Sequence, residues 1–424
     1  MDFIKTPIKG MRDCLPGDTK LRQSVIDMIR ETYAGYGFTE IETPAMEHIE
    51  NLTNKQGGEN EKLIFRILKR GQSLEEALAE GKNELADSGL RYDLTVPLAR
   101  YYANNVSSLP MPFKSLQIGS VWRADNPQKG RFRQFTQCDI DIIGENSILA
   151  EIELIAATSD MLTRIFSRIG ISGFTVHVSD RNILRAMAAY AGFSEEDFST
   201  VFIILDKFDK IGLDGVENEL KKNGYPEDAV RKYVDIFKTP AKDTARETCG
   251  FMLGSFLDEK YADGLDTIIS CVRGMVAEGV NVVFDPTLVR GMSYYTGTIF
   301  ECTTDDYHFA IAGGGRYDKM IGKYSGVDVS ACGFSIGFER IITILSDHMD
   351  PNAPASKDGV AYLIHQDTPA ETVLRVFREA QEKRREGKTV TIQGMRKNLK
   401  RQIDDLALGG YGSVVRVYKD YSGS

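Results

Sequence analysis

Hydrophobic residues at the start of the chain follow a helical spacing and then a strand-like alternation. Between residues 18 and 36, apolar side chains recur every three or four positions, and Gly35 and Gly37 close the stretch. This pattern predicts an amphipathic helix that ends at the glycines. Residues 38–44 alternate apolar with polar side chains and stop at Pro44, which predicts a strand reaching a sheet edge or a turn.

The middle of the chain alternates between strand-like and helical stretches. Residues 73–88 are charged and rich in alanine, which predicts an exposed helical excursion between two strands. Between residues 113 and 144, apolar runs flank a basic loop, RADNPQKGRFRQ, which predicts two antiparallel strands around a loop long enough to be functional. A nearly all-helical pattern then predicts a helical insertion at residues 180–257. After it, the pattern predicts strands at 282–284, 297–302 and 309–312 and a helix at 338–348.

The last part of the chain predicts a separate small domain. Residues 350–357, DPNAPASK, have the composition of a linker. Beyond them, the pattern predicts strands and helices in the order β-α-β-α-β, at residues 360–364, 369–386, 389–393, 397–408 and 413–418. This order predicts a mostly parallel, three-layer module.

The composition excludes several classes of protein. The 424 residues are 42% hydrophobic and 27% charged, which is typical of a globular chain of about three domains. The six cysteines include no C-x-x-C pair, so we expect neither a zinc cluster nor a disulfide framework. No apolar run approaches the length of about 18 residues that spans a bilayer, and the N-terminus lacks the pattern of a signal peptide. We therefore expect a cytoplasmic protein without a membrane segment.

The charge is unevenly distributed along the chain. The net charge of −9 argues against extensive binding of nucleic acid, because phosphate contacts need lysine and arginine. Residues 356–424, however, hold 13 lysines and arginines against 9 acidic residues, a net charge of +4. Any contact with nucleic acid is therefore expected on the C-terminal segment.

Two short segments match generic catalytic motifs, but such short matches often occur by chance. Residues 333–337, GFSIG, fit the G-x-S-x-G pattern of serine hydrolases, so a hydrolase built on Ser335 is one rival hypothesis. Gly387-Lys388-Thr389 resembles the end of a phosphate-binding P-loop, but Glu382 stands where the motif needs a glycine. None of the five histidines has the i, i+4 spacing of a metal site, so we interpret them as structural.

Four arginines lie beside glycines and aromatic residues, at Arg123, Arg290, Arg316 and Arg340. At such positions a guanidinium can bind phosphate oxygens bidentately, because glycine lets a ligand approach the backbone. For each arginine alone, the alternative is a solvated side chain at a helix or strand end. The four together strengthen the hypothesis of a phosphate site.

The motifs in combination resemble those of class II aminoacyl-tRNA synthetases, and of the histidyl-tRNA synthetase family in particular, across nearly the whole chain. The similar segments are the opening GMRDCLP at residues 10–16, motif 1 at 37–44, motif 2 with its PQKGR loop at 113–144, motif 3 at 333–340, and the histidine-family signatures LVRGMSYY at 288–295 and AGGGRYD at 312–318.

This resemblance implies an α+β fold. A catalytic domain at residues 1–349 would have an antiparallel sheet flanked by helices, with the helical insertion at about 180–257. A linker at 350–357 would lead to a small α/β domain at 358–424 that is similar to an anticodon-binding domain. The resemblance also implies a homodimer, because the family's motif 1 proline, here Pro44, lies at its dimer interface.

The resemblance further implies an ATP-dependent ligation. Histidine and ATP, with Mg²⁺, would form histidyl-adenylate, and the 3′ ribose of tRNA for histidine would then accept the histidyl group. The implied catalytic residues are Arg290, Arg123 and Arg340, of which Arg290 would contact the α-phosphate and the histidine carboxylate. The implied ATP-binding residues are Arg123, Arg131, Phe135, Glu339 and Arg340, with Phe135 stacking on adenine. The sequence identifies no metal ligand.

The resemblance also implies a binding site for histidine. Asp93 and Thr95, in RYDLT, would hold the substrate, and tyrosine hydroxyls would pair with the imidazole nitrogens. For either tyrosine alone, core packing with a satisfied hydroxyl is the alternative. The implied histidine-binding residues are Asp93, Thr95, Gln137, Asp141, Tyr294, Tyr295 and Tyr317. Ser293 stands where many family members have aspartate, and Asp141 where glutamate is frequent.

A second rival is a catalytically silent paralogue of the synthetase, the regulatory subunit of ATP phosphoribosyltransferase in histidine biosynthesis. Such paralogues share the fold and can bind histidine, but they tend to lose the ATP-contacting arginines and the anticodon domain. Here both the basic C-terminal module and the arginines are present, at Arg123, Arg131, Arg290 and Arg340. The sequence therefore favours the ligase.

Overall fold

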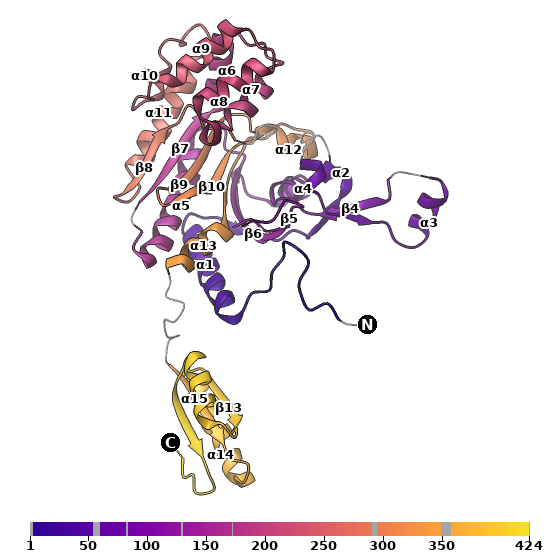
Figure 1. Cartoon of the computed structure of the whole chain (residues 1–424), viewed down its shortest axis with the longest axis vertical. Helices are drawn as coiled ribbons and strands as arrows, with labels where there is room; N and C mark the ends of the chain where they lie inside the picture. The colour runs from indigo at the N-terminus through magenta and orange to yellow at the C-terminus, as the bar shows by residue number, and fades with distance from the viewer. Residues whose placement is uncertain are drawn as a thin grey trace. The chain divides into compact units, whose positions relative to one another are not determined.

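The computed structural model describes residues 3–53, 60–81, 84–128, 130–171, 173–290, 295–348 and 358–423 (Figure 1). The chain divides into two compact units, Met1–Asp347 and His348–Ser424. The expected linker at 350–357 lies outside the described residues. Within the described ranges, no helix is both long enough and apolar enough to cross a membrane.

The larger unit is built around an eight-stranded sheet with the order β1-β5-β6-β11-β10-β9-β7-β8. Its strands are β1 Thr39–Glu40, β5 Phe113–Trp122, β6 Gln134–Ile143, β7 Phe174–Asp180, β8 Val280–Phe284, β9 Thr298–Thr304, β10 Tyr307–Arg316 and β11 Ala331–Ile336. The six strands from β5 to β7 pair antiparallel, whereas the edge strands β1 and β8 run parallel to their neighbours. The predicted antiparallel sheet is confirmed for these six strands.

Helices cover the two faces of this sheet, and the sheet lies between two hydrophobic clusters. On one face, α1 Pro16–Gly35, α5 Leu149–Phe166 and α13 Phe338–His348 pack into the main core. On the other, α4 Thr95–Asn105 and α12 Asp318–Ser325 form a smaller cluster with the outer ends of β5 and β6. Because α4 and α12 cover only part of their face, the polar side chains of the neighbouring strands remain open to a ligand.

A helical module connects β7 to β8, two neighbouring strands that run parallel. A parallel pair needs a long crossover, and here the crossover comprises α6 Arg181–Ala191, α7 Phe198–Leu205, α8 Phe208–Lys222, α9 Glu227–Lys238, α10 Ala245–Cys249 and α11 Glu259–Arg273 (Figure 1). The insertion expected at about 180–257 is helical in the structure. It continues through α11, which packs against β7, β8 and α5.

A small second sheet has the order β2-β4-β3 and includes the predicted excursion. Its elements are β2 Met46–His48, α2 Ile49–Thr53, β3 Arg66–Leu68, α3 Gln72–Ala79 and β4 Ala86–Leu90. The strand predicted at 38–44 is shorter than expected, because only β1 pairs with β5. The carbonyl groups of Thr43 and Pro44 instead accept hydrogen bonds from the Arg91 guanidinium, at 2.6 and 3.5 Å.

The smaller unit has three layers, as predicted. Its strands β12 Gly359–Ile364, β13 Val390–Gly394 and β14 Tyr411–Val417 form a parallel sheet in the order β13-β12-β14. Alternate residues of β12 pack against α14 Ala370–Arg385 on one face and α15 Leu399–Leu408 on the other. The β-α-β-α-β prediction is confirmed, with each element within two residues of its expected bounds.

Candidate active site

The strand β6 alternates between core and site. Cys138, Ile140 and Ile142 pack into the main core, whereas Gln137, Asp139 and Asp141 point to the opposite face and line a cavity. Successive residues of a strand face opposite sides, so one strand contributes both to the core and to the cavity. The polar residues of a central β-strand therefore identify the candidate site.

Three carboxylates line this cavity of about 290 Å³, which we call the carboxylate cavity. It contains six of the predicted histidine-binding residues: Asp93, Thr95, Gln137, Asp141, Tyr295 and Tyr317. The seventh, Tyr294, lies outside the described residues, as does Ser293. The cavity also contains Tyr92, Asp139 and Ser335, which the sequence motifs did not assign to the histidine site.

A hydrogen bond holds one carboxylate at the floor of the carboxylate cavity. The buried Tyr317 hydroxyl donates to Asp141 Oδ1 at 2.5 Å. A Cβ atom at Gly333 would overlap the same oxygen, so this position in β11 has room only for glycine. The Tyr317 hydroxyl is therefore engaged by Asp141, and an imidazole nitrogen would meet the pair rather than the hydroxyl alone.

Burial and mutual repulsion favour the protonated form of these carboxylates. Burial, with a smaller contribution from Asp93, raises the pKa of Asp141 to about 7, although the hydrogen bond from Tyr317 opposes the shift. Burial and the charge of Asp141 raise the pKa of Asp139 well above its usual range. Burial likewise raises the pKa of Asp93, while the backbone amide of Val96, at 3.0 Å, lowers it. A cationic ligand would relieve this repulsion.

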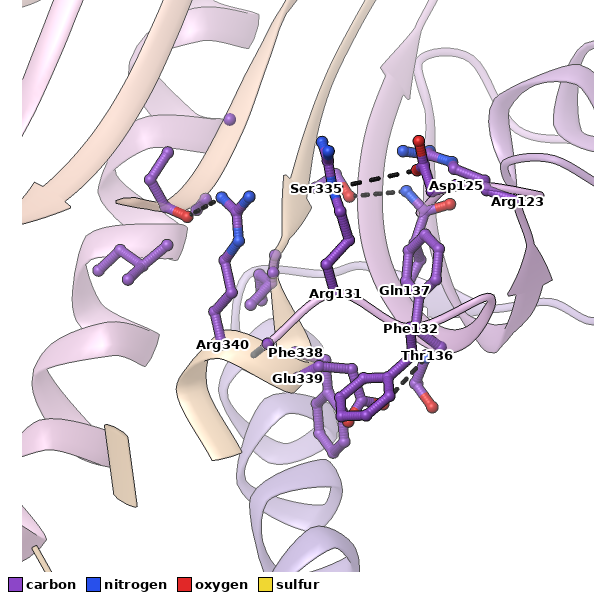
Figure 2. Close-up of a pocket in the computed structure, with 18 of the residues that line it drawn as sticks. Arg123, Asp125, Arg131, Phe132, Thr136, Gln137, Ser335, Phe338, Glu339 and Arg340 are labelled. Carbon is purple, nitrogen blue, oxygen red and sulfur yellow. Dashed lines mark hydrogen bonds and ion pairs between the residues drawn. The ribbon is translucent and has the colours of Figure 1, made fainter. Parts of the chain in front are cut away.

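A second cavity of about 340 Å³ adjoins the first, and we call it the arginine cavity (Figure 2). Arg123, Gln137, Tyr295, Gly313 and Ser335 line both cavities. The arginine cavity contains every residue predicted to bind ATP or to be catalytic: Arg123, Arg131, Phe135, Arg290, Glu339 and Arg340. The structure thus brings together residues that are up to 217 positions apart in the sequence.

Aromatic rings hold Arg123 where the two cavities meet. Its guanidinium lies 4.2 Å from the ring centroid of Tyr92 and 5.1 Å from that of Phe135. Its Nε donates to the Tyr92 carbonyl at 3.1 Å. Cation–π contacts of this kind orient the arginine while leaving its charge available to a ligand.

The other arginines of this cavity repel one another. Burial, followed by the charges of three neighbouring arginines, lowers the pKa of Arg340 to about 10. Arg340 donates to the Ala310 carbonyl, and Arg290 forms an ion pair with Glu301. Figure 2 shows the side chains of Arg131 and Arg340 extending in the same direction from the loop after β5 and from α13. A cluster of cations at this density favours a polyanionic ligand.

Glu339 is enclosed by basic groups. Its carboxylate accepts hydrogen bonds from Arg22 at 2.7 Å, from Arg12 at 2.9 Å and from the backbone amide of Thr136 at 3.2 Å. Arg12 also lies over the ring of Phe132, at 4.4 Å. Glu339 therefore connects the N-terminal segment, α1, β6 and α13 at the edge of the arginine cavity.

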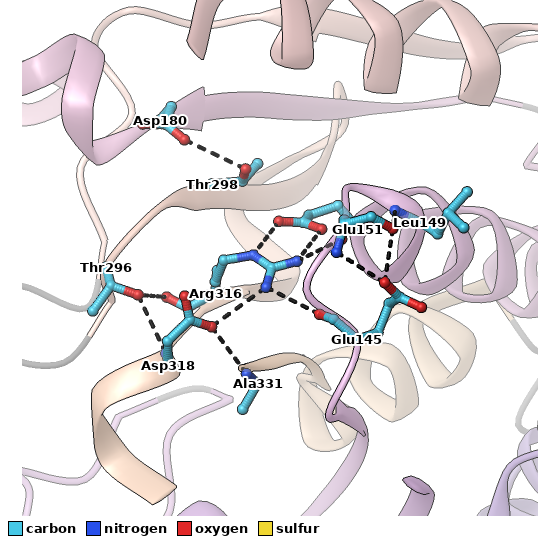
Figure 3. A network of polar contacts seen from close by, with 10 residues as sticks. Glu145, Leu149, Glu151, Asp180, Thr296, Thr298, Arg316, Asp318 and Ala331 are labelled. Atoms are coloured by element: carbon cyan, nitrogen blue, oxygen red, sulfur yellow. Dashed lines mark hydrogen bonds and ion pairs between the residues drawn. The ribbon is translucent and has the colours of Figure 1, made fainter. Parts of the chain in front are cut away.

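The fourth arginine considered for phosphate binding, Arg316, is engaged elsewhere (Figure 3). It forms two bonds of 2.6 Å with Glu151, which is 2% exposed, and a further contact of 3.3 Å with Asp318. It also donates to the carbonyl groups of Glu145 and Ser147. The phosphate hypothesis for Arg316 is therefore wrong: this arginine joins β10 to α5 and α12.

The surroundings of Ser335 do not fit a hydrolase. Ser335 lies within β11 rather than at a turn from strand to helix, and its hydroxyl donates to Asp139 at 2.6 Å.

Across the described ranges, no group of three or more histidine, cysteine, aspartate or glutamate residues could hold a metal ion. Asp139 is a site residue that sequence reasoning missed, although the period of two in QCDID places it on the same face as Gln137 and Asp141.

Comparison with known proteins identifies the family. A family model described as histidyl-tRNA synthetase matches residues 10–341. The chain belongs to the histidyl-tRNA synthetase family. One relative, a histidine–tRNA ligase from Leifsonia xyli subsp. xyli, is 41% identical over 98% of this chain and 96% of its own length. The crystal structure of a histidyl-tRNA synthetase from Nostoc sp. PCC 7120 is 27% identical, with a TM-score of 0.75 over 95% of this chain and 89% of that one.

One solved structure bears on the regulatory rival, because it is described as an ATP phosphoribosyltransferase regulatory subunit/histidyl-tRNA synthetase, from Bacillus halodurans C. It has a TM-score of 0.78 and covers 98% of this chain and 99% of that one, at 21% identity. At this identity the likeness shows a shared fold and does not favour the regulatory role. The histidyl-tRNA synthetase assignment rests on the family model and the sequence relatives.

Proposed function

We propose that this chain is a histidine–tRNA ligase that activates histidine with ATP and transfers it to tRNA for histidine. The observation that carries the proposal is the junction of the two cavities. One presents carboxylates to a cationic, hydrogen-bonding amino acid, and the other presents four arginines to phosphates. Because Arg123 and Gln137 line both, the two substrates would meet at the junction.

The activation step needs positioning and charge rather than an enzyme nucleophile. A carboxylate oxygen of histidine attacks the α-phosphorus of ATP, the bond from this phosphorus to the bridging oxygen breaks, and pyrophosphate leaves with that oxygen. Negative charge on the α-phosphate would be stabilised by Arg290 and Arg123, and the leaving pyrophosphate by Arg340 and Arg131. Phe135 would stack on the adenine. The tRNA 3′ ribose hydroxyl then attacks the carbonyl carbon of the adenylate, and AMP leaves.

The carboxylate cavity would recognise both ends of histidine. Asp93 and Thr95, with Gln137, would hold the ammonium group, and the Asp141–Tyr317 pair, with Tyr295, would face the imidazole. An apolar side chain of similar size would leave these buried polar groups unpaired, which costs binding energy. This cost is the proposed basis for selecting histidine.

Magnesium would enter as part of the nucleotide substrate. Mg²⁺ is usually bound by one or two carboxylates together with substrate phosphates rather than by a cage of protein ligands. Asp125 lines the arginine cavity, where its carboxylate lies 4.0 Å from the Arg131 guanidinium. We therefore assign the metal to the ATP phosphates, with Asp125 as the protein group available to it.

The proposed partners follow from the family and the charge distribution. The C-terminal unit, with its excess of lysine and arginine, would bind the anticodon region of tRNA. A homodimer through residues 37–44 and a cytoplasmic location belong to the same proposal.

The test is charging of tRNA with labelled histidine. Purified protein is incubated with ATP, Mg²⁺, labelled histidine and total bacterial tRNA, and acid-precipitable label is counted. The proposal expects ATP-dependent label on tRNA, with parallel reactions omitting ATP or tRNA as controls. Label that stays acid-soluble in the complete reaction would contradict the ligase assignment.

A further inference from the structure

Three polar side chains, from β6 and β11, form a directed chain along the wall of the carboxylate cavity. The Gln137 Nε2 group donates to Ser335 Oγ at 3.0 Å, and the Ser335 hydroxyl donates to Asp139 Oδ1 at 2.6 Å. Ser335 and Asp139 are direct partners across the two strands. Gln137 and Asp139 are 8% and 4% exposed, so water cannot replace these bonds without entering the cavity.

The other end of the Gln137 amide has no hydrogen-bond partner among the residues that the structure describes. Its Oε1 atom is buried and accepts no hydrogen bond from any residue that the structure describes. A buried carbonyl oxygen without a donor is costly unless a ligand supplies one. Gln137 lines both cavities, so a hydrogen-bond donor of a ligand bound there would lie next to this side chain.

The direction of the chain determines which end of the amide faces the ligand. A hydroxyl has one hydrogen to donate, and an ionised carboxylate can only accept. While Asp139 is ionised, Ser335 must donate to it and therefore accepts from Gln137, which turns the amide nitrogen to Ser335 and the oxygen to the cavity. If Ser335 instead donated toward Gln137, the amide would present its NH₂ group, which repels an ammonium ion.

We propose that Ser335 and Asp139 are positioning residues that orient the Gln137 amide so that its oxygen accepts a hydrogen bond from the substrate ammonium group. This inference rests on the proposed function and deepens it. It gives a role to the serine of the GFSIG motif and to the carboxylate that sequence reasoning missed.

The charges around Asp139 connect this orientation to the substrate. Burial raises the pKa of Asp139 and the charges of Asp141 and Asp93 raise it further, whereas Ser335 and Arg123 lower it. An ammonium ion in the cavity acts in the same direction as Arg123 and favours the ionised carboxylate. The substrate thus favours the form of Asp139 that turns the Gln137 oxygen toward it.

The test compares three variants by histidine-dependent pyrophosphate exchange with the full chain. Ser335→Ala breaks the chain but keeps the charge of Asp139, Asp139→Asn keeps the shape but can donate to Ser335, and Ser335→Thr keeps the hydroxyl. We expect the KM for histidine to rise about ten- to hundredfold in the first two and to stay near wild type in the third. The KM for ATP should change little in all three.

The matched control is Ser330→Ala. Ser330 is buried immediately before β11, and its hydroxyl has no partner among the described residues. A KM for histidine in Ser335→Ala equal to that of the Ser330→Ala control would overturn the proposal. A rise in Asp139→Asn alone would also overturn it, because Asp139 would then act by its charge and not through Ser335.

A ligand without the ammonium group makes the test independent of folding differences. 3-(Imidazol-4-yl)propionate lacks the ammonium ion, so its inhibition constant should be the same for wild type and Ser335→Ala. A difference as large as that for histidine would contradict the assignment of the Gln137 oxygen.

Failure of the proposed function can be told apart from failure of this inference. If the wild type shows no exchange, calorimetric binding of histidine to the same variants tests the orientation directly. Weaker binding by Ser335→Ala supports the inference even then, and equal binding, or no binding by the wild type, overturns it.

Discussion

At the scale of single residues, buried like charges dominate both cavities. Burial, together with neighbouring arginines, lowers the pKa of Arg340, and burial, together with neighbouring carboxylates, raises the pKa values of Asp139 and Asp141. Each set is unfavourable in the empty protein and becomes favourable when a ligand of opposite charge binds. The charges that would select the ligands therefore lower the free energy of unfolding of the protein without ligand.

This cost predicts a pH dependence for Asp141. Its pKa is about 7 in the folded protein and about 4 in an unfolded chain, so the folded state binds more protons between these values. The free energy of unfolding of the wild type should therefore fall as the pH rises through this window. Asp141→Asn, which does not titrate, should gain thermal stability relative to wild type between about pH 5 and about pH 8. If the melting temperatures of both proteins changed identically with pH, burial of Asp141 would not account for the pH dependence.

Arg290 provides the second prediction at this scale. Arg290→Ala should lower the kcat of pyrophosphate exchange by about 100- to 1000-fold, because the positive charge that stabilises the α-phosphate in the transition state is lost. The melting temperature should change little. Arg246→Ala is the matched control, since Arg246 also pairs with carboxylates, Glu259 and Asp263, on the helical module. Unchanged exchange in Arg290→Ala would remove Arg290 from the catalytic residues.

At the scale of elements, Arg316 shows how a motif residue can serve the scaffold. Its pairing with Glu151 links β10 to α5, and Asp318 links the same arginine to α12. The Glu151 carboxylate and Arg316 have side chains 2% and 12% exposed, so the pair is buried. Removing one partner of a buried ion pair leaves an uncompensated charge, which is strongly destabilising.

We expect Arg316→Ala to lower the free energy of unfolding by about 3–5 kcal/mol, measured by chemical denaturation. Arg246→Ala again provides the comparison, because it removes an exposed ion pair and should lower the free energy of unfolding only slightly. A variant that keeps its stability but binds ATP more weakly would return Arg316 to the phosphate site.

Local patterns predicted helices whose two faces differ, and they missed α5 and β11, which are buried on most sides. α1 and the two helices of the smaller unit have one apolar face, so their spacing revealed them. α5 is buried over most of its surface, and β11 is buried on both faces, so neither has an amphipathic period. α12 also went unpredicted, although it begins at Asp318, the last residue of the AGGGRYD segment.

For the candidate site as well, the sequence predicted individual residues but not the contacts between distant segments. The motif resemblance named the arginines and most of the histidine-binding residues, and the structure brings those that it describes to two adjoining cavities. Contacts between distant segments were not predictable from spacing. The pairing of Arg316 with Glu151, 165 positions away, and of Ser335 with Asp139, 196 positions away, required the fold.

In the molecule as a whole, the proposed activation site and the unit proposed to bind tRNA belong to different compact units. Every described site residue belongs to the unit Met1–Asp347, while the unit His348–Ser424 has its own sheet and core. Units with separate cores can fold separately. The division predicts that the two half-reactions depend on different parts of the chain.

A chain ending at His348 should therefore keep most of its histidine-dependent pyrophosphate exchange and lose at least about tenfold in tRNA charging, because the basic unit is gone. Mixing in the separate C-terminal unit is the control and should not restore charging. Loss of both activities in a folded, truncated protein would show that the C-terminal unit also supports activation.

The ligase assignment is best tested by exchange of labelled pyrophosphate into ATP with each of the standard amino acids in turn. It needs no tRNA and isolates the step for which the two cavities are proposed. We expect histidine alone to support exchange. A folded protein that binds histidine without any exchange would contradict the ligase assignment and favour the regulatory paralogue.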